Sequence, residues 1–444
     1  MEPPATPRPA PTSFGGILRS VGPGLIVTAN IVGTGELILT TKLGAETGFT
    51  LLWFLILGCF IKVFVQVELG RYTVAEGVSS LEALNRMPGP RARVSWIVWL
   101  WLFMYLGTLL QMAGMIVGIA DLFATPGTGA NNAWAIATAL SLVALLIGGR
   151  YGLVEKGSTL MVVLFTISTL VAVIALQWTP SRIAAGDIAE GFSFRLSDNF
   201  IKAFGAFAIT GVGAAELIFY PIWCLEKGYA RNVGPRDDSP EWIERAKGWM
   251  RVMRIDAWLS MAIYTTATIA FYLLGAAVLH RQGLRVEDKD LIPTLVPLYE
   301  ESFGTAGVWV FYVGAFMVLY STVFVSTASN SRLFADVSGL LGLPRAREPE
   351  GRKALLRFAV VAIPTVILGL YFLWGKAVTM VSVGAIGQGI MLPFLGLAAL
   401  YFRHRQIPAA LRPGRLWTLF LWLAVATMVA VGLFNLGKTV SVWG

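Results

Sequence analysis

Residues 33–38 read GTGELI and residues 213–218 read GAAELI, each within a run of otherwise apolar sequence. Each copy places one glutamate, Glu36 or Glu216, within an apolar segment that is long enough to cross a membrane. An ionisable side chain in the hydrocarbon region is costly and is usually functional. A chain that carries two such glutamates with similar neighbours therefore needs one explanation for both, and that explanation decides the fold.

The composition is typical of a membrane protein with many spans. Hydrophobic residues make up 56% of the 444 residues and charged residues only 14%, against about 25% charged residues in a soluble domain. The two cysteines, Cys59 and Cys224, lie in apolar runs and indicate neither a disulfide framework nor a metal-binding cysteine cluster. The two histidines, His280 and His404, are too few for a histidine-rich catalytic or metal site. No resident cofactor and no enzymatic activity is expected.

Eleven spans of about 20 apolar residues are predicted, following a polar, Pro-rich segment at residues 1–15 that we expect to be a disordered tail. The spans are predicted at residues 21–46, 50–75, 94–124, 132–149, 157–178, 199–227, 250–279, 304–333, 355–374, 377–402 and 415–436.

The basic residues predict the orientation. If the N-terminus is cytoplasmic, the cytoplasmic segments and helix ends hold 25 of the 35 Lys and Arg residues, and the outer side holds nine. This asymmetry favours an inner-membrane protein with its N-terminus inside and its C-terminus outside. The net charge of +9 is then explained by cytoplasmic loops that face anionic lipid, with no nucleic-acid partner. The sequence leaves the oligomeric state open, a monomer included.

The two similar stretches relate two halves of the chain. GTGELI lies in the first predicted span and GAAELI in the sixth, so the second copy crosses the membrane in the opposite direction. This pattern is typical of an inverted-topology repeat, here residues 16–180 against residues 195–402, followed by an eleventh span within residues 413–438. In such transporters the first helix of each repeat is broken near the midplane. We therefore predict an all-α fold in which broken spans 1 and 6 face each other across a central site.

The two glutamates could frame a cation at that site. Each is expected just after a break, where the N-terminal end of a half-helix stabilises negative charge. Backbone carbonyls would complete an oxygen cage, from Gly33, Thr34 and Gly213. Oxygen ligation suits Mg²⁺, Ca²⁺ or Mn²⁺. In the alternative, structural interpretation, Glu36 and Glu216 cap the exposed N–H groups of their own helices and bind no ligand.

Four further polar residues of the predicted spans are candidates for the same site. Thr28 and Asn30 precede the first predicted break and could contribute ligands, although Asn30 could instead satisfy loosened backbone. Gln111 in span 3 and Gln388 in span 10 could line a pathway, or could form hydrogen bonds between helices.

The charged residues of spans 2 and 7 have simpler interpretations. Lys62 could supply a counter-charge to a central carboxylate on the transport pathway, but it could also snorkel or pair with Glu68 about two turns further on. Glu68, Arg71 and Asp256 lie near the predicted cytoplasmic ends of their helices, where a structural network of ion pairs is expected.

At these residues the chain resembles the Nramp family of divalent metal transporters. The resemblance covers most of the chain and is carried by VGPGLIV (21–27), ETGFTLLWFLIL (46–57), VQVELGRYTVAEG (65–77) and MLPF (391–394). It implies the five-plus-five inverted repeat of the LeuT-like fold plus an eleventh helix.

The chain departs from the family pattern where the family holds its metal. The family's Asp-Pro-Gly-Asn falls on Gly33-Thr34-Gly35-Glu36, and its Met-Pro-His falls on Ala215-Glu216-Leu217. A second family histidine falls on Ile222, and the acidic residue associated with proton transfer falls on Gln111. The resemblance thus implies a retained scaffold with altered metal and proton chemistry.

These departures shape the functional expectation. Replacing a thioether by Ala215 removes a preference for soft metals and enlarges the site, so that Mg²⁺ or Mn²⁺ is favoured. Loss of titratable groups implies weak or absent proton coupling. We expect a secondary transporter that moves a divalent cation by alternating access, with Glu36 and Glu216 as its metal-binding residues. A transporter of a small organic solute on the same scaffold and a non-transporting receptor or scaffold remain the alternatives.

Overall fold

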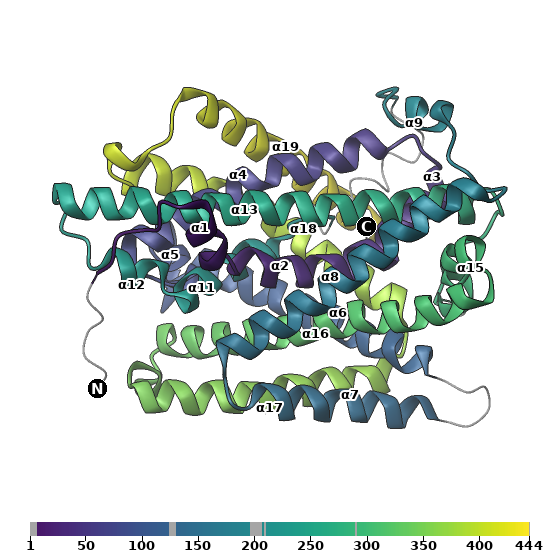
Figure 1. The fold of residues 1–444 in the computed structure, drawn as a ribbon. Helices are drawn as coiled ribbons and strands as arrows, with labels where there is room; N and C mark the ends of the chain where they lie inside the picture. Colours follow the sequence, from purple (N-terminus) through teal and green to yellow (C-terminus); the bar gives the residue numbers. More distant parts are fainter. Residues whose placement is uncertain (1–6, 124–129, 196–206, 208–209, 289–290, 444) are drawn as a thin grey trace.

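The computed structural model describes residues 7–123, 130–195, 207, 210–288 and 291–443, with a few side chains, such as that of Thr34, left outside the described set. Within these residues, nine helices are long and apolar enough to cross a membrane (Figure 1). They are α2–η1–α3 (Pro23–Thr47), α4 (Leu52–Glu76), α6 (Trp96–Leu122), α8–η2 (Tyr151–Trp178), α13–η3 (Pro240–His280), α16 (Thr305–Leu340), α17 (Pro349–Trp374), α18–η5 (Ala377–Gln406) and the Arg415–Phe434 part of α19 (Arg415–Trp443).

Two further predicted spans correspond to shorter helices. The fourth is α7 (Ala130–Leu146), and the sixth ends in α11 (Ala214–Lys227), most of the stretch before Thr210 lying outside the described residues. The seventh span was predicted ten residues too short, because α13 begins at Pro240 rather than at residue 250. The Ser239 side chain caps this start by accepting a hydrogen bond from the backbone N–H of Trp242 (3.1 Å).

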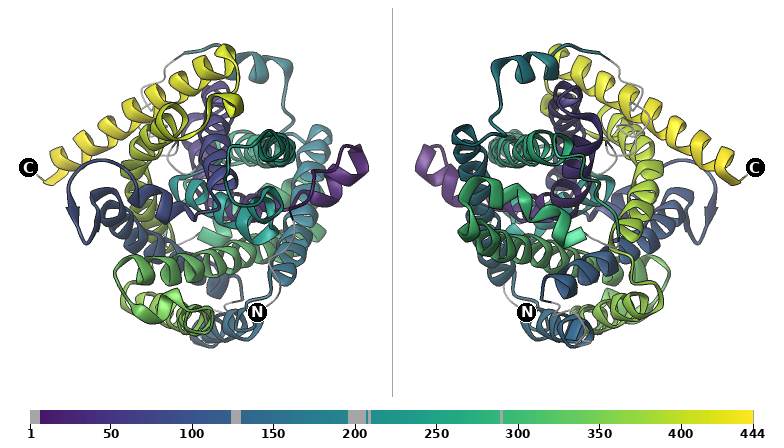
Figure 2. Two further views of the ribbon diagram at one scale, coloured as in Figure 1. Left: turned by 90° about the vertical axis from the view of Figure 1, so that its left-hand side faces the viewer. Right: turned by 90° about the vertical axis from the view of Figure 1, so that its right-hand side faces the viewer.

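Short elements connect the long helices. They include α1 (Phe14–Ser20), α5 (Ser80–Asn85), α9 (Ala185–Gly191), α12 (Tyr229–Val233), α14 (Leu291–Leu295), α15 (Pro297–Phe303), η4 (Pro344–Arg347), η6 (Ala409–Leu411) and a small antiparallel hairpin of β1 (Arg91–Ala92) and β2 (Val94–Ser95). In Figure 1, α7 and α17 lie together at one edge of the bundle and α19 at the opposite edge. The two end views of Figure 2 show the remaining long helices between these edges.

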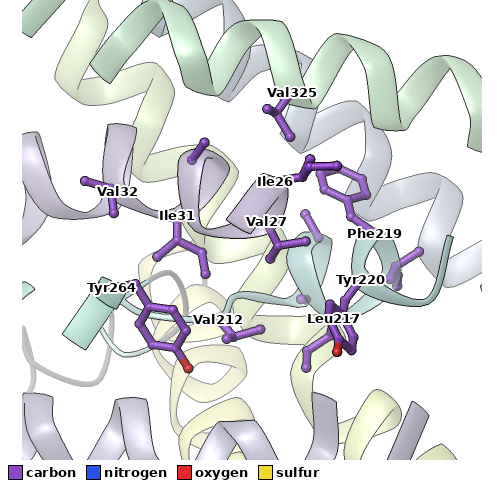
Figure 3. Close-up of a cluster of buried hydrophobic side chains, with 14 of the residues drawn as sticks. Ile26, Val27, Ile31, Val32, Val212, Leu217, Phe219, Tyr220, Tyr264 and Val325 are labelled. Atoms are coloured by element: carbon purple, nitrogen blue, oxygen red, sulfur yellow. The ribbon is translucent and has the colours of Figure 1, made fainter. Parts of the chain in front are cut away.

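The helices that carry the two similar stretches lie antiparallel at the centre. Asn30, near the end of α2 (Pro23–Ile31), donates a hydrogen bond to Glu216, near the start of α11. In the opposite direction along both helices, Asp256 of α13 accepts hydrogen bonds from Gly22, just before α2, and from Tyr220, one turn beyond Glu216 in α11. This arrangement agrees with the inverted repeat predicted from the sequence. Figure 3 shows the apolar side chains that fill the crossing, which include those of α2 and α11.

The predicted break in span 1 is wrong. α2 continues without interruption into a nine-residue π-helix, η1 (Val32–Thr40), and then into α3 (Thr41–Thr47). Gly33 serves a close approach rather than a break, since a Cβ at this position would overlap the side chain of Thr322 in α16. A π-helical segment widens the turn and redirects side chains, and such segments are frequent at functional sites.

Span 6, by contrast, contains the predicted interruption. Residues 210–213 are not helical, and Gly211 has φ of 65°, in the left-handed region that favours glycine. α11 begins directly after Gly213, whose carbonyl accepts the first helical hydrogen bond from the N–H of Leu217 (3.0 Å). The repeat is therefore asymmetric in its centre, with a π-helix in one half and a non-helical interruption in the other.

Part of the segment predicted to be a disordered tail is held against the bundle. The N–H of Arg8 donates to the carbonyl of Asn232 (2.8 Å), and the indole N–H of Trp249 donates to the carbonyl of Arg8 (2.8 Å). Residues 7–13 therefore have ordered contacts with α12 and α13, while residues 1–6 lie outside the described residues.

Removing the Asp256 carboxylate should destabilise the fold. Its oxygens accept hydrogen bonds from the N–H groups of Gly22 (2.8 Å) and Gly24 (2.7 Å), which satisfy the orphan donors at the start of α2, and from the Tyr220 hydroxyl (3.1 Å). We expect Asp256→Ala to lower the free energy of unfolding by about 1–3 kcal/mol, because buried donors lose their acceptor. Thermal unfolding of the detergent-solubilised protein measures this loss of stability. Asp256→Asn keeps one acceptor oxygen, so its Tm should lie between those of the wild type and Asp256→Ala. An Ala variant that melts like the wild type would contradict the capping role.

Candidate functional site

A small cavity lies where α2, α6, α11, α16 and α18 meet. Its volume is about 10 Å³, roughly the room that one water molecule needs. Its lining is mostly polar although it is deep in the bundle: Asn30, Thr108, Gln111, Met112, Met115, Ala215, Glu216, Ser326 and Gln388. Four of the residues proposed from the sequence, namely Asn30, Ala215, Glu216 and Gln388, and the predicted pathway residue Gln111 thus meet at one point.

Glu216 is the charged residue of this lining. It is 7% exposed and lies in the first turn of α11, where the helix dipole favours a negative charge. One carboxylate oxygen accepts a hydrogen bond from the side-chain amide of Asn30, and the Asn30 carbonyl oxygen accepts one from the Ser326 hydroxyl (2.6 Å). Asn30 therefore connects α2 to both α11 and α16, and it positions the carboxylate at the cavity.

The two glutamines form a second chain of hydrogen bonds. The side-chain oxygen of Gln388 accepts the backbone N–H of Ala215 (3.0 Å), one of the orphan donors at the start of α11. The Gln388 amide nitrogen donates to the side-chain oxygen of Gln111 (2.8 Å). Spans 3, 6 and 10 are thus joined at the cavity, so both interpretations of these glutamines, lining and interhelical bonding, apply together.

Sequence reasoning missed four lining residues. Thr108, Met112 and Met115 lie on the same face of α6 as Gln111, and Ser326 lies on α16. The available signal was the spacing of these residues, which lie three, four and seven positions after Thr108, since such positions share one face of a helix. The two methionines also correct the argument from Ala215: thioethers line this cavity, but they come from span 3 instead of span 6.

Glu36 does not line this cavity. It is fully buried in η1, and its Oε1 accepts hydrogen bonds from the N–H of Gly211 (3.1 Å) and the hydroxyl of Thr268 in α13 (2.8 Å). Its Oε2 has no hydrogen-bond partner among the described residues. The expected symmetric pair of glutamates around one cation is therefore not formed in this conformation.

The remaining candidates from the first span also point elsewhere. The Thr28 hydroxyl bonds to the carbonyl of Gly24 (2.8 Å) and to the hydroxyl of Ser260 in α13 (2.7 Å), and Gly33 packs on Thr322. The side chain of Thr34 lies outside the described set. Within the described residues, no group of three or more His, Cys, Asp or Glu side chains could hold a metal ion.

Lys62 is fully buried in α4, and it neither snorkels nor pairs with Glu68. Its ammonium donates hydrogen bonds to the carbonyls of Phe207 (2.7 Å) and Thr210. Glu68 instead forms ion pairs with Arg71 (3.3 Å) and Arg403 (3.4 Å), which confirms the expected structural network for those residues. Asp256, expected in the same network, caps α2 as described above.

Two ion pairs close the side of the bundle on which α11 ends. Lys227 pairs with Glu155 of α8 (2.5 Å), and Glu226 pairs with Arg332 of α16 (3.1 Å). The Arg332 guanidinium also lies over the ring of Trp223, 4.4 Å from its centroid. These contacts tie the second half of span 6 to spans 5 and 8.

Known proteins resemble the chain in sequence and fold. The divalent metal cation transporter MntH of Mesorhizobium japonicum is 22% identical over 369 residues, which cover 80% of this chain and 74% of the relative. A crystal structure of a variant manganese transporter from Eremococcus coleocola matches with a TM-score of 0.70 and 17% identity, over 98% of this chain and 89% of that one. MhsT, solved with L-phenylalanine, matches with a TM-score of 0.57 and 16% identity, over 96% of this chain and 100% of that one. The fold is therefore LeuT-like.

The family model for natural resistance-associated macrophage protein-like (Nramp) sequences matches nearly the whole chain. Because this match spans residues 24–437, the chain belongs to the Nramp family of transporters, and it is not an enzyme.

Proposed function

We propose that the chain is a secondary transporter that moves a divalent cation by alternating access, through the cavity beside Glu216. The observation that carries this proposal is a carboxylate at the start of α11, buried among amide and hydroxyl oxygens from four other helices. A charge so deep in a bundle is costly unless it meets a partner. A divalent cation is a partner of the matching sign and of a size that oxygen ligands hold.

The residues that line the cavity would supply different ligands to the cation. Glu216 would supply the negative charge, and neutral oxygens would complete the ligand set, from Asn30, Gln111, Ser326 and Gln388. Carbonyl and carboxylate oxygens suit Mg²⁺ and Mn²⁺, while thioethers add a preference for transition metals. The presence of Met112 and Met115 therefore places Mn²⁺ ahead of Mg²⁺ in our proposal. With a volume of about 10 Å³, the cavity must widen before a hydrated ion can enter.

Weak proton coupling and the orientation complete the proposal. Among the residues that line the cavity, Glu216 is the titratable one, and Gln111 cannot carry a proton between protein and solvent. The basic residues favour a cytoplasmic N-terminus, which would place the Lys227–Glu155 and Glu226–Arg332 pairs on the cytoplasmic side.

Uptake into liposomes tests this function. The purified protein is reconstituted, and influx of Mn²⁺, Mg²⁺ and Ca²⁺ is recorded with internal dyes together with internal pH. We expect saturable Mn²⁺ influx, weaker Mg²⁺ influx and little acidification. A rise in the Tm of the purified protein with amino acids or other small organic ions, and none with divalent cations, would instead favour an organic cargo. No flux of either kind under any gradient would favour a non-transporting receptor.

A further inference from the structure

One peptide bond in the interrupted span 6 lies between two buried charges. The carbonyl of Thr210 accepts a hydrogen bond from the ammonium of Lys62, and the N–H of Gly211, in the same peptide unit, donates to Glu36 Oε1 (3.1 Å). The positive charge therefore meets the negative end of the peptide dipole, and the negative charge meets its positive end. Lys62 comes from α4, Glu36 from η1 and the peptide from span 6, so three spans meet at this unit.

This contact solves a problem that the interruption creates. Non-helical backbone at membrane depth leaves N–H and C=O groups unpaired, and each is costly unless protein or water satisfies it. The Lys62 ammonium also donates a hydrogen bond to the carbonyl of Phe207 (2.7 Å) and lies 4.5 Å from the centroid of the Phe207 ring. Two carbonyls, an aromatic face and a nearby carboxylate are the surroundings that a small cation takes in an otherwise dry protein.

We propose that the Lys62 ammonium is a tethered cation that occupies a monovalent-cation site formed by span 6 carbonyls and Glu36, so that the transporter needs no Na⁺ to hold span 6 in place. A second observation is independent of the Lys62 contacts: Oε2 of Glu36 is buried and has no hydrogen-bond partner among the described residues. A free cation could bind this oxygen, whereas the ammonium is held in place by its side chain. Glu36 is then a residue that positions the Thr210–Gly211 peptide of span 6. Of the two glutamates, only Glu216 contacts the cargo.

Substitutions of Lys62 separate this proposal from a packing role. Lys62→Ala removes the ammonium and leaves space beside the carbonyls, whereas Lys62→Met fills most of that space without charge. In buffers of equal ionic strength, we expect Na⁺ or Li⁺ to raise the Tm of Lys62→Ala saturably relative to choline. We expect no cation-specific change for the wild type or for Lys62→Met, and Lys62→Ala combined with Glu36→Gln should lose the response.

The opposite pattern would overturn the proposal: a Na⁺-specific rise in Tm for the wild type, or equal behaviour of Lys62→Ala and Lys62→Met. If neither Lys62 variant can be purified, the wild type still decides, since a Tm or an uptake rate that depends on Na⁺ over choline contradicts a tethered cation. The Tm is measured without divalent cations. Its outcome therefore tests the role of Lys62 independently of whether the proposed cargo is correct.

Discussion

Glutamine in place of Glu216 is expected to slow divalent-cation uptake by at least about tenfold. Two unit charges about 4 Å apart attract by about 4 kcal/mol at an effective dielectric constant of 20, and about 1.4 kcal/mol already corresponds to a factor of ten in affinity. Glutamine keeps an oxygen that can accept the hydrogen bond of Asn30, so the contact between α2 and α11 is retained. The loss should therefore appear as weaker binding and slower initial uptake in liposomes, with little change in Tm.

The matched control is Glu36→Gln, which removes the other buried carboxylate from the same pair of similar stretches. Because Glu36 contacts Gly211 and Thr268 and does not line the cavity, its substitution should leave the dissociation constant for the cation nearly unchanged. A change in Tm is the expected effect instead. Equal losses of affinity in both variants would show that the two glutamates bind one ion together, as the sequence alone suggested.

The comparison of the two glutamates shows what the local sequence could predict. Hydropathy and the repeated stretch predicted the spans, their inversion and the meeting of spans 1 and 6. Similar letters also predicted similar roles, but the structure places the two glutamates in different surroundings. Glu216 lies at the start of a helix after an interruption, whereas Glu36 lies within a continuous π-helix. The contact of Gly33 with Thr322, almost 300 residues away in sequence, has no local signature.

The lining of the cavity could be predicted in part. Polar residues in apolar spans stand out, and Asn30, Gln111, Glu216 and Gln388 were found in this way. Met112 and Met115 did not stand out, because a methionine in a membrane span has the same hydropathy as its neighbours. Their role depends on which face of α6 turns toward α11, and this is set by packing between helices that the sequence of one span does not contain.

Arg332→Ala is expected to open the side of the bundle on which α11 ends. Arg332 is 2% exposed, pairs with Glu226 (3.1 Å) and lies over Trp223, so it fixes α11 to α16 through both charge and ring contact. A cation–π contact alone is worth about 0.5–2 kcal/mol. Loss of the pair adds about 1 kcal/mol, a value that partial exposure of Glu226 keeps modest. The closed state would then lose about 1.5–3 kcal/mol, which corresponds to a shift of tenfold or more in the equilibrium.

The native thiol of Cys224 reports this opening directly. It is fully buried in α11, one residue from Trp223, and a Cys59→Ser background leaves it as the single cysteine of the chain. Maleimide labelling of Cys224 should therefore accelerate about tenfold in Arg332→Ala, in proportion to the population of the open state. Arg352→Ala is the matched control, since it breaks an ion pair with Asp336 (2.8 Å) between α17 and α16 and keeps the Glu226–Arg332 pair of α11. If both arginine variants label at the wild-type rate, or accelerate equally, Arg332 does not hold α11 closed, and the closure must come from the Lys227–Glu155 pair and the apolar packing around it.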